Sequence, residues 1–137
     1  MRIAAQGLTL ELSPVNALDS EDWCRVRVVA QTPPFQGEQV VYLMGANLVH
    51  FLNCARAIYN NVGTPAEAVL SCPEPGLELV LSMTSLGGII GAYKIQGEFV
   101  EGGAPTLSGG FQMDRSYLPS MIRDLEDLLS QVGAHET

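Results

Sequence analysis

The sequence predicts a single α+β domain with an antiparallel sheet of about six to seven strands and two helices, the second at the C-terminus. Several segments alternate apolar and polar residues and end at Gly or Pro, as strands do. Two other segments repeat apolar residues every three or four positions, as helices do. Because the strand-like segments follow one another and are not each paired with a helix, we expect an antiparallel sheet. The 137 residues suit one domain, expected over 1–132 with a frayed tail at 133–137.

Alternation defines the expected strands. Leu8, Leu10 and Leu12 alternate with polar residues up to Pro14, which predicts a strand with one wet face. Gly87-Gly88 interrupts a later apolar run and predicts a hairpin turn. Strands are expected at 8–13, 23–30, 39–43, 66–71, 77–82, 89–100 and 106–113.

Two segments carry helical periodicity. The first is expected from Asn47 to Tyr59, with Asn47 as N-cap and stop residues at 60–63. The second follows Asp114 and Ser116, either of which can cap it, and places Pro119 in its first turn, where a missing N–H costs nothing. Its apolar face comprises Leu118, Met121, Ile122, Leu125, Leu128, Leu129 and Val132.

The charge balance limits the kind of partner. Carboxylates outnumber Lys and Arg by 15 to 7, for a net charge of −8, which argues against nucleic-acid binding and favours a basic protein partner. The alternative is that acidity serves only solubility. The longest uncharged run, between Glu38 and Arg56, changes character halfway, so we expect no membrane span. The first residues lack the apolar core of a signal peptide, and we expect a cytoplasmic protein.

No motif indicates catalysis or a cofactor. Three cysteines without a Cys-x-x-Cys pair, and two histidines, make neither a disulfide framework nor a zinc site. His50 and Cys54 lie four residues apart and could form a dyad, but ordinary helix packing accounts for them. The glycines at 87–91 lack the spacing of a phosphate-binding loop. We therefore expect no catalytic, cofactor-binding or metal-binding residues, and no enzyme.

Two groups of carboxylates are the candidate partner-binding residues. They lie in a predicted loop and on the wet face of the last helix: Asp19, Glu21 and Asp22, and Asp124, Glu126 and Asp127. A merely solvated surface is the alternative for both groups. Trp23 and Phe35 are candidate interface anchors because aromatic residues dominate binding hot spots, although core packing is the simpler account of Trp23.

The segment at 109–119, Gly-Gly-Phe-Gln-Met-Asp-Arg-Ser-Tyr-Leu-Pro, is the most distinctive of the chain. Together with Gly7–Leu12, Asp22-Trp23, Phe35-Gln36-Gly37 and Leu77-Glu78-Leu79, it resembles the WapI-type (wall-associated-protein) immunity proteins of bacterial toxin–immunity systems. The likeness covers nearly the whole chain. It implies a small cytoplasmic protein that binds and neutralises a toxin, in the named case a nuclease, without catalytic residues of its own.

Three kinds of function stay open at this point. The first is a non-catalytic binding protein that neutralises a basic toxin domain. The second is a small acidic chaperone-like module, such as a type III secretion chaperone, or an α+β protein without a toxin partner. The third is an enzyme, which would need a pocket around His50 or a desolvated carboxylate. A homodimer is compatible with the first two.

Overall fold

The computed structural model describes residues 1–60 and 66–134. Within them lie two helices and eight strands in two four-stranded antiparallel sheets. The expected α+β class, with its second helix at the C-terminus, is confirmed. The expected count of six to seven strands is wrong, since an additional strand lies at the N-terminus. The helix stop expected at 61–63 and the end of the expected tail, 135–137, lie outside the described residues.

Each sheet is a simple meander in chain order. The first sheet contains β1 (Arg2–Ala5), β2 (Leu8–Pro14), β3 (Trp23–Thr32) and β4 (Phe35–Met44). Helix α1 (Gly45–Asn60) then leads to the second sheet. That sheet contains β5 (Glu67–Ser71), β6 (Leu77–Met83), β7 (Ile89–Gln96) and β8 (Thr106–Met113). A short 3₁₀ turn, η1 (Arg115–Tyr117), precedes the closing helix α2 (Leu118–Val132).

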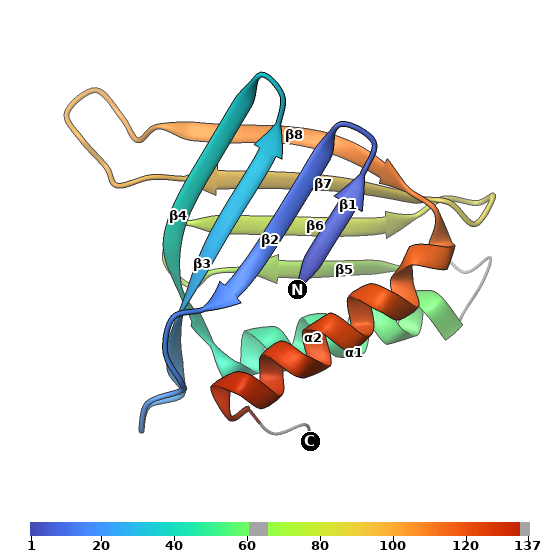
Figure 1. Ribbon diagram of the computed structural model, residues 1–137, viewed down its shortest axis with the longest axis horizontal. Coiled ribbons are helices and arrows are strands. Elements are labelled where there is room, and N and C mark those ends of the chain that lie inside the picture. The colour runs from blue at the N-terminus through green and yellow to red at the C-terminus, as the bar shows by residue number, and fades with distance from the viewer. Residues whose placement is uncertain (61–65, 135–137) are drawn as a thin grey trace.

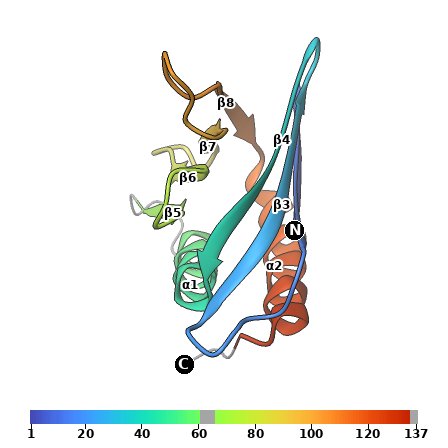
Figure 2. The same cartoon turned by 90° about the vertical axis from the view of Figure 1, so that its left-hand side faces the viewer.

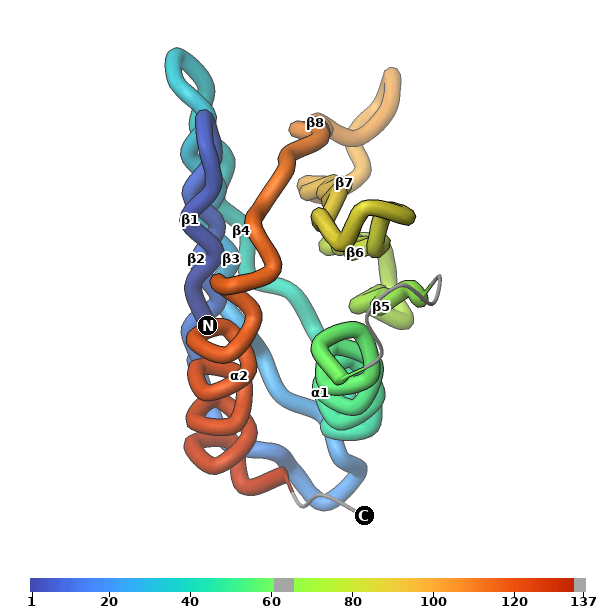
Figure 3. Tube along the Cα trace, turned by 90° about the vertical axis from the view of Figure 1, so that its right-hand side faces the viewer, coloured from blue at the N-terminus to red at the C-terminus, as the bar shows by residue number. Residues whose placement is uncertain are grey.

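The two sheets lie face to face, with their strands crossing obliquely (Figure 1). Figures 2 and 3 show the two layers from opposite sides. One layer contains β1–β4, and the other contains β8, β7, β6 and β5 followed by α1. Helix α1 packs along β5, and α2 packs against α1 and the nearby strands β1 and β2. The helices therefore close one end of the sandwich, whereas β8 and the β3–β4 hairpin lie at the other end.

Apolar side chains at alternate positions of the strands fill the space between the two sheets. In β3, Cys24, Val26, Val28 and Ala30 are buried, while Arg25 and Arg27 lie on the outer face. Seven residues of α2 are also buried, and they are the ones that the helical spacing predicts: Leu118, Met121, Ile122, Leu125, Leu128, Leu129 and Val132. No polar or charged residue is buried in the described part of the chain. Apolar burial is thus the main source of stability.

Two glycines of the second sheet are covered by aromatic rings on the neighbouring strand. Gly91 is paired with Phe111, and Gly109 is paired with Tyr93, across β7 and β8. A Cβ at Gly91 would lie 2.1 Å from Phe111 Cζ, so the ring occupies the space of a side chain. This arrangement is the aromatic rescue of a glycine in a sheet. It explains the Gly-Gly-Phe sequence at 109–111 as a packing device.

At the junction between β8 and α2, Asp114, one of the two expected caps, provides the capping oxygen: its Oδ1 accepts a hydrogen bond of 2.8 Å from the Ser116 N–H and caps η1. Helix α2 itself begins without a side-chain cap. The hydrogen bond from Ser116 also lowers the pKa of the Asp114 carboxyl. The next residue, Arg115, donates a hydrogen bond to the Tyr59 carbonyl and lies 5.1 Å from the centre of the Tyr59 ring. The junction therefore ties the start of α2 to the end of α1.

The glycine–ring pair generates a stability prediction. We expect Gly91→Ala to lower the free energy of unfolding by about 2 kcal/mol, because the new methyl group must displace the Phe111 ring from a packed layer. Gly110→Ala is the control, since a Cβ there would lie 3.4 Å from its nearest neighbour. Urea unfolding of both variants measures the difference. Equal stability of the two variants would contradict this account of Gly91.

Candidate protein-binding surface

The predicted acidic loop follows β2 and is organised by its own carboxylates. Asp19 Oδ1 accepts hydrogen bonds from the backbone N–H groups of Glu21 and Trp23, at 2.9 and 3.0 Å. The Leu18 N–H donates to the Val132 carbonyl at 2.8 Å, which places the loop at the C-terminal end of α2. The Asp19 carboxylate therefore shapes the loop. The side chain of Glu21 is exposed and has no hydrogen bond or ion pair within residues 1–60 and 66–134.

Asp22 caps helix α1. Its Oδ2 accepts a hydrogen bond of 3.3 Å from the Ala46 N–H, and its carbonyl accepts one of 3.0 Å from the Gly45 N–H. Its φ is 68°, in the left-handed region, which Asp tolerates better than most residues. The expected cap, Asn47, instead accepts a hydrogen bond of 2.9 Å from the Met44 N–H, because the helix begins two residues earlier, at Gly45.

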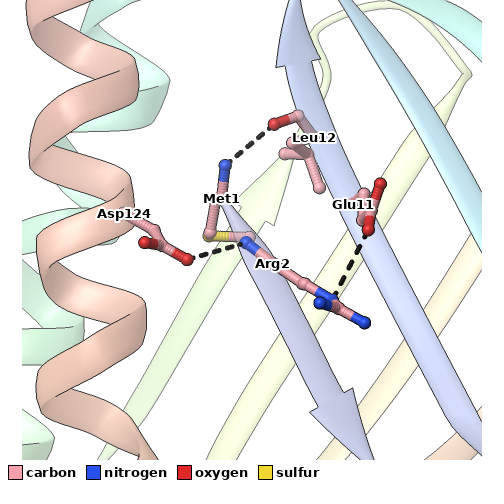
Figure 4. A network of polar contacts seen from close by, with 5 residues as sticks. All are labelled: Met1, Arg2, Glu11, Leu12 and Asp124. Carbon is pink, nitrogen blue, oxygen red and sulfur yellow. Dashed lines mark hydrogen bonds and ion pairs between the residues drawn. The ribbon is translucent and has the colours of Figure 1, made fainter.

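Two of the predicted carboxylates of α2 meet a third from β2 in an open groove of about 340 Å³. Asp124 Oδ2 accepts a hydrogen bond of 3.2 Å from the Arg2 N–H, and Glu11 pairs with the Arg2 guanidinium at 3.4 Å (Figure 4). Asp127 lines the same groove and makes no hydrogen bond or ion pair in the described part of the chain. We name Glu11, Asp124 and Asp127 the acidic groove.

Charges in the acidic groove act on the amino group of Met1. This group donates a hydrogen bond of 2.8 Å to the Leu12 carbonyl (Figure 4). Burial lowers its pKa, and the carboxylates of Asp124, Glu11 and Asp127 act in the opposite direction. The groove therefore contains three carboxylates and two cationic groups, and Asp127 is the carboxylate that makes no direct hydrogen bond or close ion pair there.

The six predicted residues do not form one cluster. Glu126 lies on another side of α2 and pairs with Arg56 of α1 at 3.5 Å. Asp19, Asp22 and Asp124 make hydrogen bonds that hold the fold together. Glu21 and Asp127 are left as exposed carboxylates without a partner in the described residues. Glu11 was missed by the sequence reasoning because it looks like an ordinary wet-face residue of β2.

The alternative chemistry around His50 has little geometric support. His50 Nε2 and Cys54 Sγ lie 3.6 Å apart on α1, so the two side chains do meet. The pocket beside His50 is lined by Asp22, but this carboxylate bonds the Ala46 N–H at the helix start. In the described residues no hydrogen-bonded carboxylate orients the imidazole. The same residues contain no group of three or more His, Cys, Asp or Glu that could bind a metal ion.

The outer face of the first sheet carries aromatic and basic residues. Trp23 is half-buried there and not in the core, because its side chain has the same orientation along β3 as Arg25 and Arg27. Tyr42 is the cross-strand neighbour of Arg25 and is 49% exposed. Arg27 pairs with Glu38 at 2.7 Å. Phe35, in contrast, shares the inner side of β4 with the buried Val41 and Leu43, but at the start of the strand it is 64% exposed, so it is not a core residue.

Neither α1 nor α2 is long and apolar enough to cross a membrane, and no other helix in residues 1–60 and 66–134 is a candidate.

The cap at Asp22 predicts a loss of stability on truncation. We expect Asp22→Ala to cost about 1–2 kcal/mol, because it removes a helix cap and places alanine at positive φ. Asp22→Asn keeps both the acceptor and the tolerance of this φ, so it should cost less. Glu21→Ala, which removes an exposed neighbour, should change stability by less than about 0.5 kcal/mol. Thermal and urea unfolding test the order, and an Asp22→Ala variant as stable as Glu21→Ala would refute the capping role.

Cys72 should be a slow nucleophile. Burial raises the pKa of its thiol to about 11. Because the thiolate reacts and the thiol does not, alkylation of Cys72 by iodoacetamide at pH 8 should be slower than in the unfolded chain, on the order of a hundredfold. Mass spectrometry of peptides after timed labelling, in buffer and in denaturant, gives the ratio. Equal rates in the two conditions would contradict the burial effect.

Comparison with known protein families gives a match that extends over nearly the whole chain. The model of the Immunity protein WapI-like family matches residues 1–133. No curated protein and no solved structure gives a significant match. The match covers both sheets, both helices, the acidic loop and the acidic groove. The chain belongs to the WapI-like immunity protein family.

Proposed function

We propose that this protein binds and neutralises a cognate bacterial toxin, and that the toxin is a basic, nuclease-type domain. Membership of an immunity protein family carries the proposal. The charge of the chain supports it, because a net charge of −8 attracts a basic partner and speeds the encounter. Neutralisation then needs no chemistry by this chain. It requires only that the bound protein cover the site where the toxin holds nucleic acid.

The contact surface in this proposal includes the exposed side of α2 and the loop at its C-terminal end. Asp127 in the acidic groove and Glu21 in the loop make no hydrogen bond or close ion pair in the described residues, so both are available to Lys or Arg of a toxin. Asp19 fixes the backbone of Glu21 by a hydrogen bond, and Asp22 and Asp124 bond the backbone of α1 and β1 beside them. We place the interaction in the cytoplasm, where a nuclease toxin would reach its substrate.

A charge-matched pair of variants tests this surface. Co-expression with the toxin domains encoded beside its gene should restore growth, and the purified pair should form a complex. The double variant Glu21→Gln/Asp127→Asn should weaken this complex about tenfold at low salt, and less at high salt, because exposed charges are screened. The control, Glu74→Gln/Glu78→Gln, removes the same charge from the β5–β6 turn and the outer face of β6 and should bind like the unmodified protein.

Two results would count against the proposal. If no such toxin domain is bound and none is neutralised, the toxin-binding function is wrong. If both double variants weaken the complex equally, the effect is one of net charge, and the surface lies elsewhere.

A further inference from the structure

Three of the four sheet edges in the described residues are covered or partly protected. On β1, the outward N–H of Arg2 bonds Asp124 Oδ2 at 3.2 Å. On β4, the outward N–H groups of Val40 and Met44 bond the side-chain oxygens of Gln39 and Asn47, at 3.1 and 2.9 Å. The outward N–H groups between them and towards the hairpin make no hydrogen bond in the described residues, but the charged side chain of Glu38 lies on that stretch. Helix α1 packs along β5 (Figure 3). Proteins commonly cover sheet edges in this way, because unpaired backbone groups invite another strand.

The fourth edge, β8, is open. The Gly97 N–H bonds the Pro105 carbonyl at 2.8 Å, which fixes the pairing pattern: odd-numbered residues of β8 bond β7. The N–H and C=O groups of Thr106, Ser108 and Gly110 therefore point away from the sheet. All three residues are exposed, and these backbone groups have no recorded partner in residues 1–60 and 66–134. We name these three residues the β8 edge.

The side chains at the β8 edge do not block an added strand. They are small and uncharged, and the residue between Ser108 and Gly110 is also glycine. Lysine, a β-bulge or an inserted proline commonly protects exposed edges, and none interrupts β8, whose pairing with β7 is continuous from Thr106 to Met113. The edge is therefore geometrically ready to pair along its length.

The first sheet projects past this edge. Figures 1 and 2 show the β3–β4 hairpin extending beyond β8. Gly37 marks where the sheets still touch, since a Cβ there would lie 2.9 Å from Leu107 Cδ2 of β8. Phe35 has the same orientation two residues further out and is 64% exposed. Its ring belongs to the inner face of the first sheet, at a point where the second sheet has already ended.

We propose that the β8 edge receives one extended strand from the protein partner. The backbone of this strand would bond Thr106, Ser108 and Gly110, and its apolar side chains, at alternate positions, would pack under Phe35. We favour a strand of a partner over a second copy of this chain, because pairing β8 with β8 by symmetry would bring the projecting hairpins of both copies into the same layer. That this strand belongs to the toxin rests on the proposed function. The backbone bonds and the alternating apolar side chains of the strand follow from the β8 edge and Phe35 alone.

The test uses peptides as the probe. A phage-displayed library of random peptides about ten residues long, panned on the intact protein, should yield peptides with apolar residues at alternate positions. Hydrogen exchange of the Thr106, Ser108 and Gly110 amides should slow when the protein is saturated with such a synthetic peptide. Ser108→Pro removes one outward N–H without breaking a bond to β7, so it should keep the fold and weaken binding about tenfold or more.

Matched controls separate edge pairing from damage to the fold. Ser108→Ala keeps the N–H and should bind within about twofold of the unmodified protein. Phe35→Ser should weaken binding, whereas Phe99→Ser, an 80% exposed aromatic in the β7–β8 loop, should not. Failure to enrich any alternating peptide, unchanged exchange at the β8 edge, or equal binding by Ser108→Pro would overturn the inference. Peptide binding as expected, without binding of any toxin domain, would instead refute the proposed function alone.

Discussion

The fold depends on one requirement: each sheet has a single apolar face, and neither face can be buried without the other sheet. The alternation in β3 and β6 shows this on the two sides, since every second residue is buried and those between are half-buried or exposed. The helices complete the enclosure at one end of the sandwich. The Arg115–Tyr59 contact holds the two helices together where α2 begins. Because the helices close only this end, the opposite end is the place where backbone and aromatic groups are exposed.

Local periodicity accounts for most of the elements that could be predicted from the sequence. The alternation at Leu8–Leu12 and the seven-residue apolar face of α2 can each be recognised within a single segment of the sequence. Strand β1 was missed because its four residues carry little alternation, and it is a strand only through its pairing with β2. The division into two sheets was also missed. The boundary between the sheets at α1 depends on which strands pair with which. Alternation within one strand does not contain this information.

The surface was harder to predict than the fold, for a related reason. The sequence identifies Asp22 and Asp124 as exposed carboxylates, but their hydrogen bonds join segments distant in the chain. Asp124 bonds a backbone group 122 residues away, and Asp22 bonds one 24 residues away. A carboxylate that caps a helix and one that makes no hydrogen bond look alike in the sequence. The unpaired edge of β8 likewise follows from the order of strands in the sheet, which cannot be inferred from the pattern of residues in one segment.

The Phe111 ring over Gly91 has a consequence for the family's history. The two positions share one volume, so a side chain cannot appear at Gly91 while an aromatic ring remains at Phe111. A substitution at either site is tolerated best when the other changes with it. Relatives should therefore inherit this pair as a unit, with glycine opposite an aromatic residue or two side chains of intermediate size. The Gly-Gly-Phe sequence would then be maintained by packing between β7 and β8, independently of any surface that contacts a partner.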